Sequence, residues 1–269
     1  MKKYLPIIGV ILVWSSAYPL IKIALAYMSP IVLAIIRLAV GGFILAIYAK
    51  GFIYGIKEFI GAILNVSLFL ILLNFGVMFS PNPALSATLI YTQPVFIVIL
   101  NYFVFNEKVN LAKILGVIIA ISGAIYASGS LKINLGALIS IIGGFIWAVG
   151  TVFYRKFLIN KDVVKLNSFM SLVSVPILFL FLPLNYYFKF SIEGILMAII
   201  LGITAQALGF IFWFISIKNL GSFKASVLSL FVPPFSYIFS YLILGAIPTV
   251  EEIVGSSLVL LGILLTFKS

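Results

Sequence analysis

The chain of 269 residues is 64% hydrophobic and only 9% charged, and its mean hydropathy is +1.31. A soluble domain carries about 25% charged residues, so this composition excludes a soluble globular protein and indicates one that lipid surrounds. The net charge of +11 is therefore not a footprint for nucleic acid, and no nucleic-acid partner is expected beside the lipid bilayer.

Ten apolar segments follow one another, each close to the length of about 20 residues that a helix needs to cross a bilayer. We therefore expect an all-α integral membrane protein with ten transmembrane helices. Two of them carry clear start signals, Asn82 before Pro83 and the capping box of Thr249 and Glu252. The expected helices span residues 4–26, 30–49, 58–79, 83–104, 110–128, 134–155, 163–184, 192–216, 220–243 and 248–267.

Basic residues in the short loops predict the orientation of these helices. With the N-terminus inside the cell, thirteen basic residues fall in cytoplasmic segments and only Lys132 and Lys189 in outer loops. Positive charge gathers on the cytoplasmic side, so we expect a multi-pass plasma-membrane protein with both termini in the cytoplasm. The thirteen are Lys2, Lys3, Lys50, Lys57, Lys108, Lys113, Arg155, Lys156, Lys161, Lys165, Lys218, Lys224 and Lys268.

The chain repeats at half its length. A shift of 139 residues carries Leu89, Pro94, Phe96, Ile99, Tyr102, Gly116 and Gly123 onto Leu228, Pro233, Phe235, Ile238, Tyr241, Gly255 and Gly262. Near the start of each half, a shift of 133 carries Trp14 onto Trp147 and Lys22 onto Arg155. Each half would hold five helices, an odd number, so the second half (residues 129–269) is expected to be inverted relative to the first (residues 1–128). Such repeats are typical of transporters, which bind their substrate near the repeat interface.

Lys22 and Arg37 are the charges expected deepest in the membrane. Lys22 lies four residues before the end of the first span and Arg37 seven after the start of the second, so both lie roughly 6–10 Å below the outer surface. A charge at the centre of a membrane helix costs about 2.5–3.5 kcal/mol, and no acid within a span offsets this. The two cations could bind a carboxylate or phosphate of a substrate. Alternatively, Lys22 reaches the interface and Arg37 binds helix-end carbonyls.

Two helix faces carry aromatic and polar residues at intervals of four. Trp14, Tyr18 and Lys22 share one face of the first helix, and Trp147, Thr151 and Arg155 share the matching face of the sixth. These faces could line a substrate pathway, or they could be packing stripes with Arg155 as an ordinary cytoplasmic anchor.

Polar residues at mid-depth in other spans could likewise line a substrate pathway or serve helix packing. Amides inside a membrane need hydrogen-bond partners, so they either face a cavity or join neighbouring helices. In matching spans, Gln93-Pro94 and Pro233-Pro234 predict kinks, because a proline removes a backbone donor. Such kinks could act in gating or serve packing alone. The mid-depth residues are Asn65, Asn74, Gln93, Thr204 and Gln206.

The order of four segments resembles the EamA-type branch of the drug/metabolite transporter superfamily. They are "VWSSAYPLIK" (13–22), "SPIVLAIIRL" (29–38), "ALSATLIYTQPVFIVILNYFVFNEKV" (84–109) and "KASVLSLFVPPFSYIFSYLILG" (224–245). The resemblance covers almost the whole chain and implies a binding centre near the first, third, fourth, sixth, eighth and ninth spans. The family often ends its fourth and ninth spans with Gly-Glu, whereas this chain has Asn106-Glu107 and Gly245-Ala246.

We expect a carrier that moves a small polar or anionic metabolite, an amino acid or similar, by alternating access; export is expected on the family's precedent. No histidine is present and all six acids fall in loops or at helix ends, so no intramembrane proton relay is expected. The chain also lacks cysteine, and we expect no metal or cofactor.

The sequence also bears on three other classes of protein. An enzyme would need a nucleophile–base set or clustered carboxylates, which the sequence lacks. A multidrug or lipophilic-cation exporter of the same superfamily would be expected to hold an intramembrane acid. A membrane scaffold or receptor would not require matched kinks. Whether the carrier is a monomer or a homodimer stays open. The candidate substrate-binding residues are Trp14, Tyr18, Lys22, Arg37, Asn74, Gln93, Trp147, Thr151 and Gln206, and the candidate gating prolines are Pro94, Pro233 and Pro234.

Overall fold

The computed structural model describes residues 2–107, 110–127 and 135–267, and their regular structure is helical apart from one isolated bridge between Met28 and Phe188. Among these residues, eight helical segments are long and apolar enough to cross a membrane, and two further helices, α7 and α14, complete the ten that were predicted. The all-α membrane fold is thus confirmed. Lys108, Lys132, Lys268 and the expected boundary between the halves lie outside the described residues.

The first half contains five helical rods, preceded by a 3-10 turn (Lys2–Tyr4). They are α1 (Leu5–Ala24), α2 (Pro30–Ala49), α3 (Ile56–Ala62) joined to α4 (Leu68–Phe79) by a π turn (Ile63–Ser67), α5 (Pro83–Ile90) followed by α6 (Gln93–Phe105), and α7 (Leu111–Ala127).

The second half repeats this plan. Its rods are α8 (Leu135–Phe153) with a π turn (Tyr154–Leu158), α9 (Val163–Phe181) with a 3-10 turn (Leu182–Leu184), α10 (Ile192–Leu201) joined to α11 (Gly209–Leu220) by a π turn (Gly202–Leu208), α12 (Ser222–Leu228) joined to α13 (Val232–Leu244) by a 3-10 turn (Ser229–Phe231), and α14 (Val250–Phe267).

The predicted start signals act as caps. The side chain of Asn82 accepts a hydrogen bond from the amide of Ala84 at 3.0 Å. Thr249 and Glu252 exchange two hydrogen bonds, of 3.1 and 3.2 Å, at the start of α14. These bonds satisfy amides that the first turn of a helix leaves without partners, and so they fix where the two helices begin.

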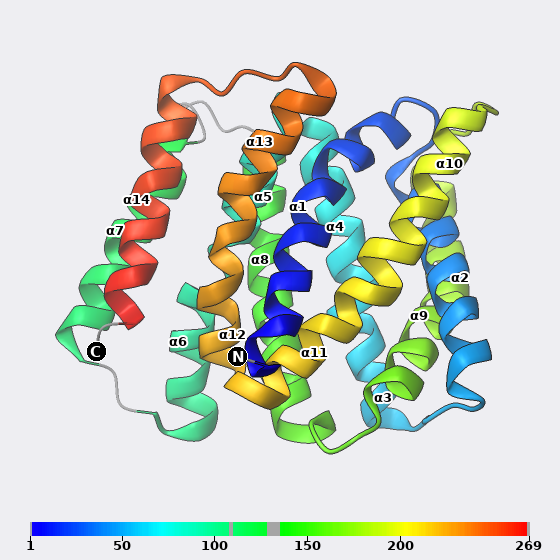
Figure 1. The fold of residues 1–269 in the computed structure, drawn as a ribbon, viewed down its shortest axis with the longest axis horizontal. Helices are drawn as coiled ribbons and strands as arrows, with labels where there is room; N and C mark the ends of the chain where they lie inside the picture. The colour runs from blue at the N-terminus through cyan, green and yellow to red at the C-terminus, as the bar shows by residue number, and fades with distance from the viewer. Residues whose placement is uncertain (1, 108–109, 128–134, 268–269) are drawn as a thin grey trace.

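The rods run roughly side by side, and the two halves run in opposite directions (Figure 1). α1 begins and α14 ends toward the same end of the bundle, the lower end in Figure 1, which we call the terminal end. α1 runs away from the terminal end, whereas α8, its counterpart, runs toward it. The structure therefore shows the inverted arrangement that an odd number of helices per half requires.

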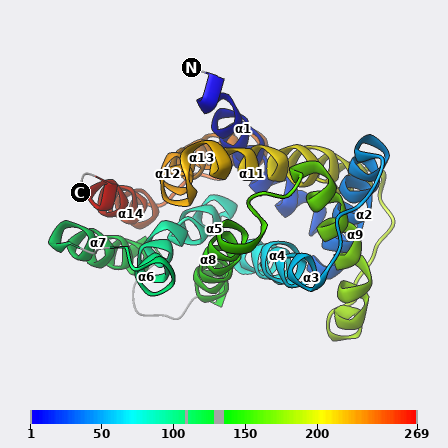
Figure 2. The same cartoon turned by 90° about the horizontal axis from the view of Figure 1, so that it is seen from below.

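Seen along the bundle, α7 and α14 form one edge and α2 and α9 form the opposite edge (Figure 2). Glycines permit the close approach of α7 and α14. A Cβ at Gly123 would lie 2.7 Å from the carbonyl oxygen of Gly255, and one at Gly262 would lie 2.5 Å from that of Gly116. The repeated glycines of these spans therefore serve packing, away from the centre of the molecule.

The two halves deviate from a regular α-helix at matching places. The π turns that begin at Ile63 and Gly202 are separated by 202 − 63 = 139 residues, the same shift that relates the two halves. The fourth and ninth rods are both interrupted directly before their prolines, at Tyr91-Thr92 and at Ser229–Phe231. π turns are frequent at functional sites, and these deviations all lie inside their rods and not at the ends.

A candidate substrate cavity

A small cavity lies at the centre of the bundle. It leaves about 20 Å³ for the centres of water molecules, which is room for a water but not for a metabolite. Its walls come from both halves, through α1, α2, α4, the break between α5 and α6, α8 and α11. The lining residues are Trp14, Ala17, Tyr18, Ile21, Arg37, Phe69, Leu73, Tyr91, Trp147 and Phe210.

Aromatic rings make up most of the wall. Trp147 is the hub: its ring centroid lies 5.4 Å from Trp14, 5.3 Å from Phe69, 5.2 Å from Tyr91 and 4.9 Å from Trp213. Most of these contacts are edge-on or tilted, the geometries that aromatic pairs prefer, and each pair contributes about 0.5–1.5 kcal/mol beyond its buried area. The repeated tryptophans of the two halves therefore meet, which joins the halves at the cavity.

Arg37 is the one charged residue of the lining. It is 2% exposed, and its Nε and Nη1 atoms have no hydrogen-bond partner among the described residues. The two ion pairs that the described residues form, Arg155–Glu107 and Lys161–Glu58, do not include it. A buried guanidinium without an anion is unfavourable by several kcal/mol, so this site favours a ligand that supplies a negative charge.

A π turn positions Trp14. Its indole Nε1 donates a 3.0 Å hydrogen bond to the carbonyl oxygen of Ala205, in the π turn between α10 and α11. Such a turn disturbs the regular backbone ladder and leaves carbonyl groups available for side-chain donors. Directly after the turn, Gly209 packs against the same indole, and a Cβ there would overlap it.

The break in the fourth rod positions Tyr91. The backbone leaves the α-helix there because Pro94 has no amide hydrogen, and the rod restarts at Gln93. The Tyr91 ring is buried against Trp147, and its hydroxyl has no partner among the described residues. The indole nitrogen of Trp147 is likewise buried without an acceptor among the described residues, as is that of Trp213 packed against it, so Tyr91 and Trp147 give the cavity wall two unused hydrogen-bond donors.

Lys22, another predicted site residue, does not line the cavity. Its ammonium donates to the carbonyl oxygens of Val77, Met78 and Ser80, at 3.2, 3.2 and 2.7 Å. Lys22 thus caps the C-terminal end of α4 and ties it to α1. The role left open for Arg37, binding helix-end carbonyls, belongs to Lys22 in the structure.

The predicted polar residues at mid-depth mainly join helices. The Asn74 amide donates to the Pro30 carbonyl at 2.9 Å and thereby joins α4 to α2. Gln93 donates to Thr151 at 3.0 Å, between α6 and α8, and Gln206 donates to Ser171 at 2.9 Å, between its π turn and α9. These contacts correspond to the second interpretation of the amides, interhelical hydrogen bonding.

The ninth rod does not contribute to the cavity: among the described lining residues, none comes from α12 or from α13, the helix that contains Pro233 and Pro234. The second rod, by contrast, contributes Arg37. The rods that line the cavity are therefore the expected ones, except that the second takes the place of the ninth.

Three aromatic residues of the lining were not predicted, Phe69, Tyr91 and Phe210, and neither was Trp213, which packs against Trp147. Trp213 was missed because the shift of 139 carries Asn74 onto it, so the repeat offers no matching aromatic residue. The signal that could have found Tyr91 is its place two residues before Gln93, at the expected kink.

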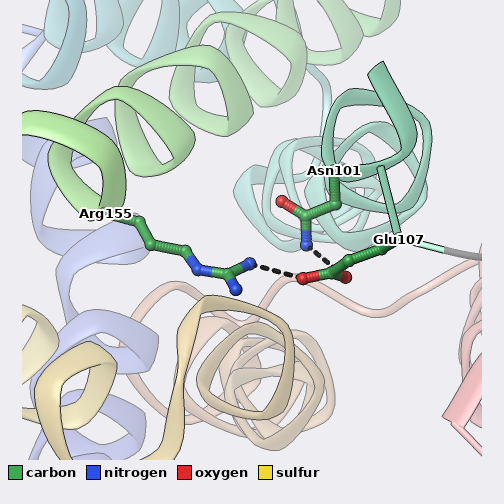
Figure 3. Close-up of polar contacts among 3 residues, drawn as sticks. All are labelled: Asn101, Glu107 and Arg155. Atoms are coloured by element: carbon green, nitrogen blue, oxygen red, sulfur yellow. Dashed lines mark hydrogen bonds and ion pairs between the residues drawn. The ribbon is translucent and has the colours of Figure 1, made fainter. Parts of the chain in front are cut away.

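A second polar cluster lies at the terminal end (Figure 3). There Glu107, just past the end of α6, binds Arg155 in the π turn after α8 at 2.8 Å and accepts a 3.1 Å hydrogen bond from the Asn101 amide. The Arg155 guanidinium also lies 4.1 Å from the centre of the Phe105 ring. Asn106, in the place of the family's glycine, adopts φ +53°, close to the +65° of Gly245 in the second half.

The model of the EamA-like transporter family matches residues 1–129 and again residues 134–268. The chain belongs to the EamA-like transporter family. It is therefore a membrane transporter and not an enzyme.

Several relatives match nearly the whole chain. An uncharacterized transporter of Bacillus subtilis (YoaV) is 23% identical over 98% of this chain and 96% of its own length, and one of Archaeoglobus fulgidus is 27% identical over 100% and 99%. A protein of Streptantibioticus cattleyicolor named as a "probable terminal-alkyne amino-acid exporter" is 26% identical over 95% of this chain and 90% of its own. A solved crystal structure that is 19% identical superposes with a TM-score of 0.74, over 99% of this chain and 97% of that one, and shows the same fold.

Proposed function

We propose that this EamA-like transporter moves a small metabolite that carries a carboxylate and an apolar or aromatic part, as an amino acid does. The observation that supports this most is Arg37, whose buried guanidinium lacks an anion and lines a cavity walled by aromatic rings. The carboxylate would bind the free N–H groups of Arg37, and the apolar part would lie against the rings. A relative named as an amino-acid exporter is in keeping with this class and with export.

Transport would proceed by alternating access between the two inverted halves, residues 1–128 and 129–269. The cavity is too small for such a substrate in this state, so the halves must separate on one side to admit it. Side chains that form hydrogen bonds between helices around the cavity would keep each group of helices rigid while the groups move. Among them are Lys22, Asn74, Gln93 and Gln206.

The same proposal includes no proton relay within the membrane. No aspartate, glutamate or histidine belongs to the described cavity lining, so proton transfer has no acceptor there. A gradient of the substrate itself would drive transport, with both termini of the carrier in the cytoplasm. The proposal holds for a monomer or a homodimer.

A lipophilic-cation exporter is the second candidate, because the aromatic walls could hold a cation by cation–π contacts. Arg37 argues against it, since its charge would repel a cation at the same place. Binding of phenylalanine, phenylalanine amide and tetraphenylphosphonium by the purified protein separates the two. Our proposal predicts that phenylalanine raises the melting temperature and that the amide, without a carboxylate, does not. Stabilisation by tetraphenylphosphonium alone would favour the cation exporter.

A further inference from the structure

The ion pair of Arg155 and Glu107 joins the two halves of the bundle at its terminal end (Figure 3). Glu107 follows α6 in the first half, and Arg155 follows α8 in the second. The two side chains are 40% and 30% exposed, so solvent reaches the pair but does not surround it. Asn101 holds the second carboxylate oxygen of Glu107, which fixes the direction of the carboxylate toward Arg155.

The repeat relates this contact to one at the opposite end of the bundle. Arg155 corresponds to Lys22 by the shift of 133 and Glu107 to Ala246 by the shift of 139, so α1 and α13 repeat the contact of α8 and α6. The opposite contact has no carboxylate, because Ala246 takes the place of the acid and Lys22 binds the end of α4 instead. Among the described residues, the terminal end is therefore held by two ion pairs between the halves, Glu107–Arg155 and Glu58–Lys161, whereas the opposite end has none.

On the helices beside the ion pair, a set of buried polar atoms has no partners among the described residues. They belong to α6, to the π turn after α8 and to α12, which packs beside α6 at the terminal end. An unpaired buried polar group is unfavourable, and water would satisfy these atoms if the helices parted. The atoms are Gln93 Oε1, Asn101 Oδ1, Tyr154 Oη, Ser222 Oγ and Ser226 Oγ.

We propose that the Glu107–Arg155–Asn101 cluster is the gate of the transport pathway at the terminal end, and that the passage it closes runs between α6, α8 and α12. This inference rests on the proposed transport function. The ion pair holds the passage shut, and its loss shifts the protein toward a state open at that end. On α13, the hydroxyls of Ser236 and Ser240 have no partner among the described residues, and no ion pair of the described residues joins the halves at the end opposite the gate.

The accessibility of one buried passage residue tests the gate without any substrate. The chain has no cysteine, so Ser226→Cys introduces a single thiol into the passage, where the native hydroxyl is fully buried. In the purified protein, we expect Glu107→Gln to raise the rate of maleimide labelling of this thiol about two- to fivefold, the effect of a partly exposed ion pair on an equilibrium. Arg155→Gln should raise it equally, and the exchanged pair Glu107→Arg with Arg155→Glu should restore the slower rate.

The control variant removes the other ion pair of the terminal end. Glu58→Gln breaks the 2.9 Å contact between Lys161 and Glu58, which lies away from α6 and α12. We expect it to leave the labelling rate of the passage thiol unchanged. Equal labelling in the wild-type and Glu107→Gln backgrounds would overturn the gate, as would an equal increase in Glu58→Gln, because the effect would then be a general loosening. The labelling rate of the passage thiol does not depend on whether Arg37 binds a carboxylate. The gate and the proposed substrate can therefore be refuted independently of each other.

Discussion

The indole of Trp14 in the first half donates a hydrogen bond to the carbonyl of Ala205 in the second, 191 residues away along the chain. The bond depends on the π turn, which makes that carbonyl available, and on Gly209, which leaves room for the ring. One wall of the cavity is therefore built jointly by the two inverted halves. A change at this contact should affect the stability of the fold and the shape of the cavity together.

Gly209→Ala should destabilise the protein by about 1–3 kcal/mol, because its Cβ would overlap the Trp14 indole and displace it. Thermal unfolding of the purified protein measures this effect. The matched control is Gly143→Ala, also at a buried helical glycine, where the nearest atom to the new Cβ would be 3.4 Å away. If Gly143→Ala destabilised the protein as much as Gly209→Ala, the overlap with Trp14 would not be the cause.

Topology can be tested with single cysteines at exposed positions of a chain that has none of its own. We expect cysteines at Lys189 and Thr249 to react with an impermeant thiol reagent added outside cells, since both turns lie opposite the terminal end. Cysteines at Lys57, at the start of α3, and at Asn160, in the turn before α9, lie at the terminal end and should react only after the membrane is opened. The reverse pattern would place the termini outside the cell.

Transport into liposomes should change little between pH 6 and pH 8. The described cavity lining contains no acid or histidine that could exchange a proton with the substrate. We therefore expect a substrate gradient alone to drive uptake of a labelled amino acid, and an imposed proton gradient to leave its final level unchanged. Accumulation above the external concentration, powered by the proton gradient, is incompatible with this mechanism.

The sequence predicts the fold well because membrane crossing imposes a length and an apolar composition on each helix. It also predicts that Trp14, Tyr18 and Trp147 belong together, since the period of a helix fixes their faces and the repeat relates the two tryptophans. It does not distinguish the roles of Lys22 and Arg37, because the carbonyls that bind Lys22 lie 55 to 58 residues further along the chain. Such contacts depend on how the helices pack, which neither period nor repeat determines.

The interruptions of the fourth and ninth rods show the same limit of prediction from sequence. Pro94 and Pro233 predict interruptions in matching rods, and the structure has them. Only the first places an aromatic residue, Tyr91, in the cavity wall, because the inverted halves are not equivalent in sequence. The same difference in sequence between the halves explains why the second rod lines the cavity and the ninth does not.

Binding of the substrate carboxylate by Arg37 is tested by the variant Arg37→Gln. A charge-assisted hydrogen bond contributes about 1.5–3 kcal/mol, so affinity for a carboxylate ligand such as phenylalanine should fall about ten- to a hundredfold. The control is Lys22→Gln, which removes a nearby cation that caps α4 and should lower stability more than affinity. The measurement is ligand affinity of the folded fraction of each variant by isothermal titration. We expect the affinity for phenylalanine to fall in Arg37→Gln and to stay nearly unchanged in Lys22→Gln. If Arg37→Gln folded poorly but its folded fraction bound phenylalanine with wild-type affinity, Arg37 would be a structural residue and not the carboxylate site.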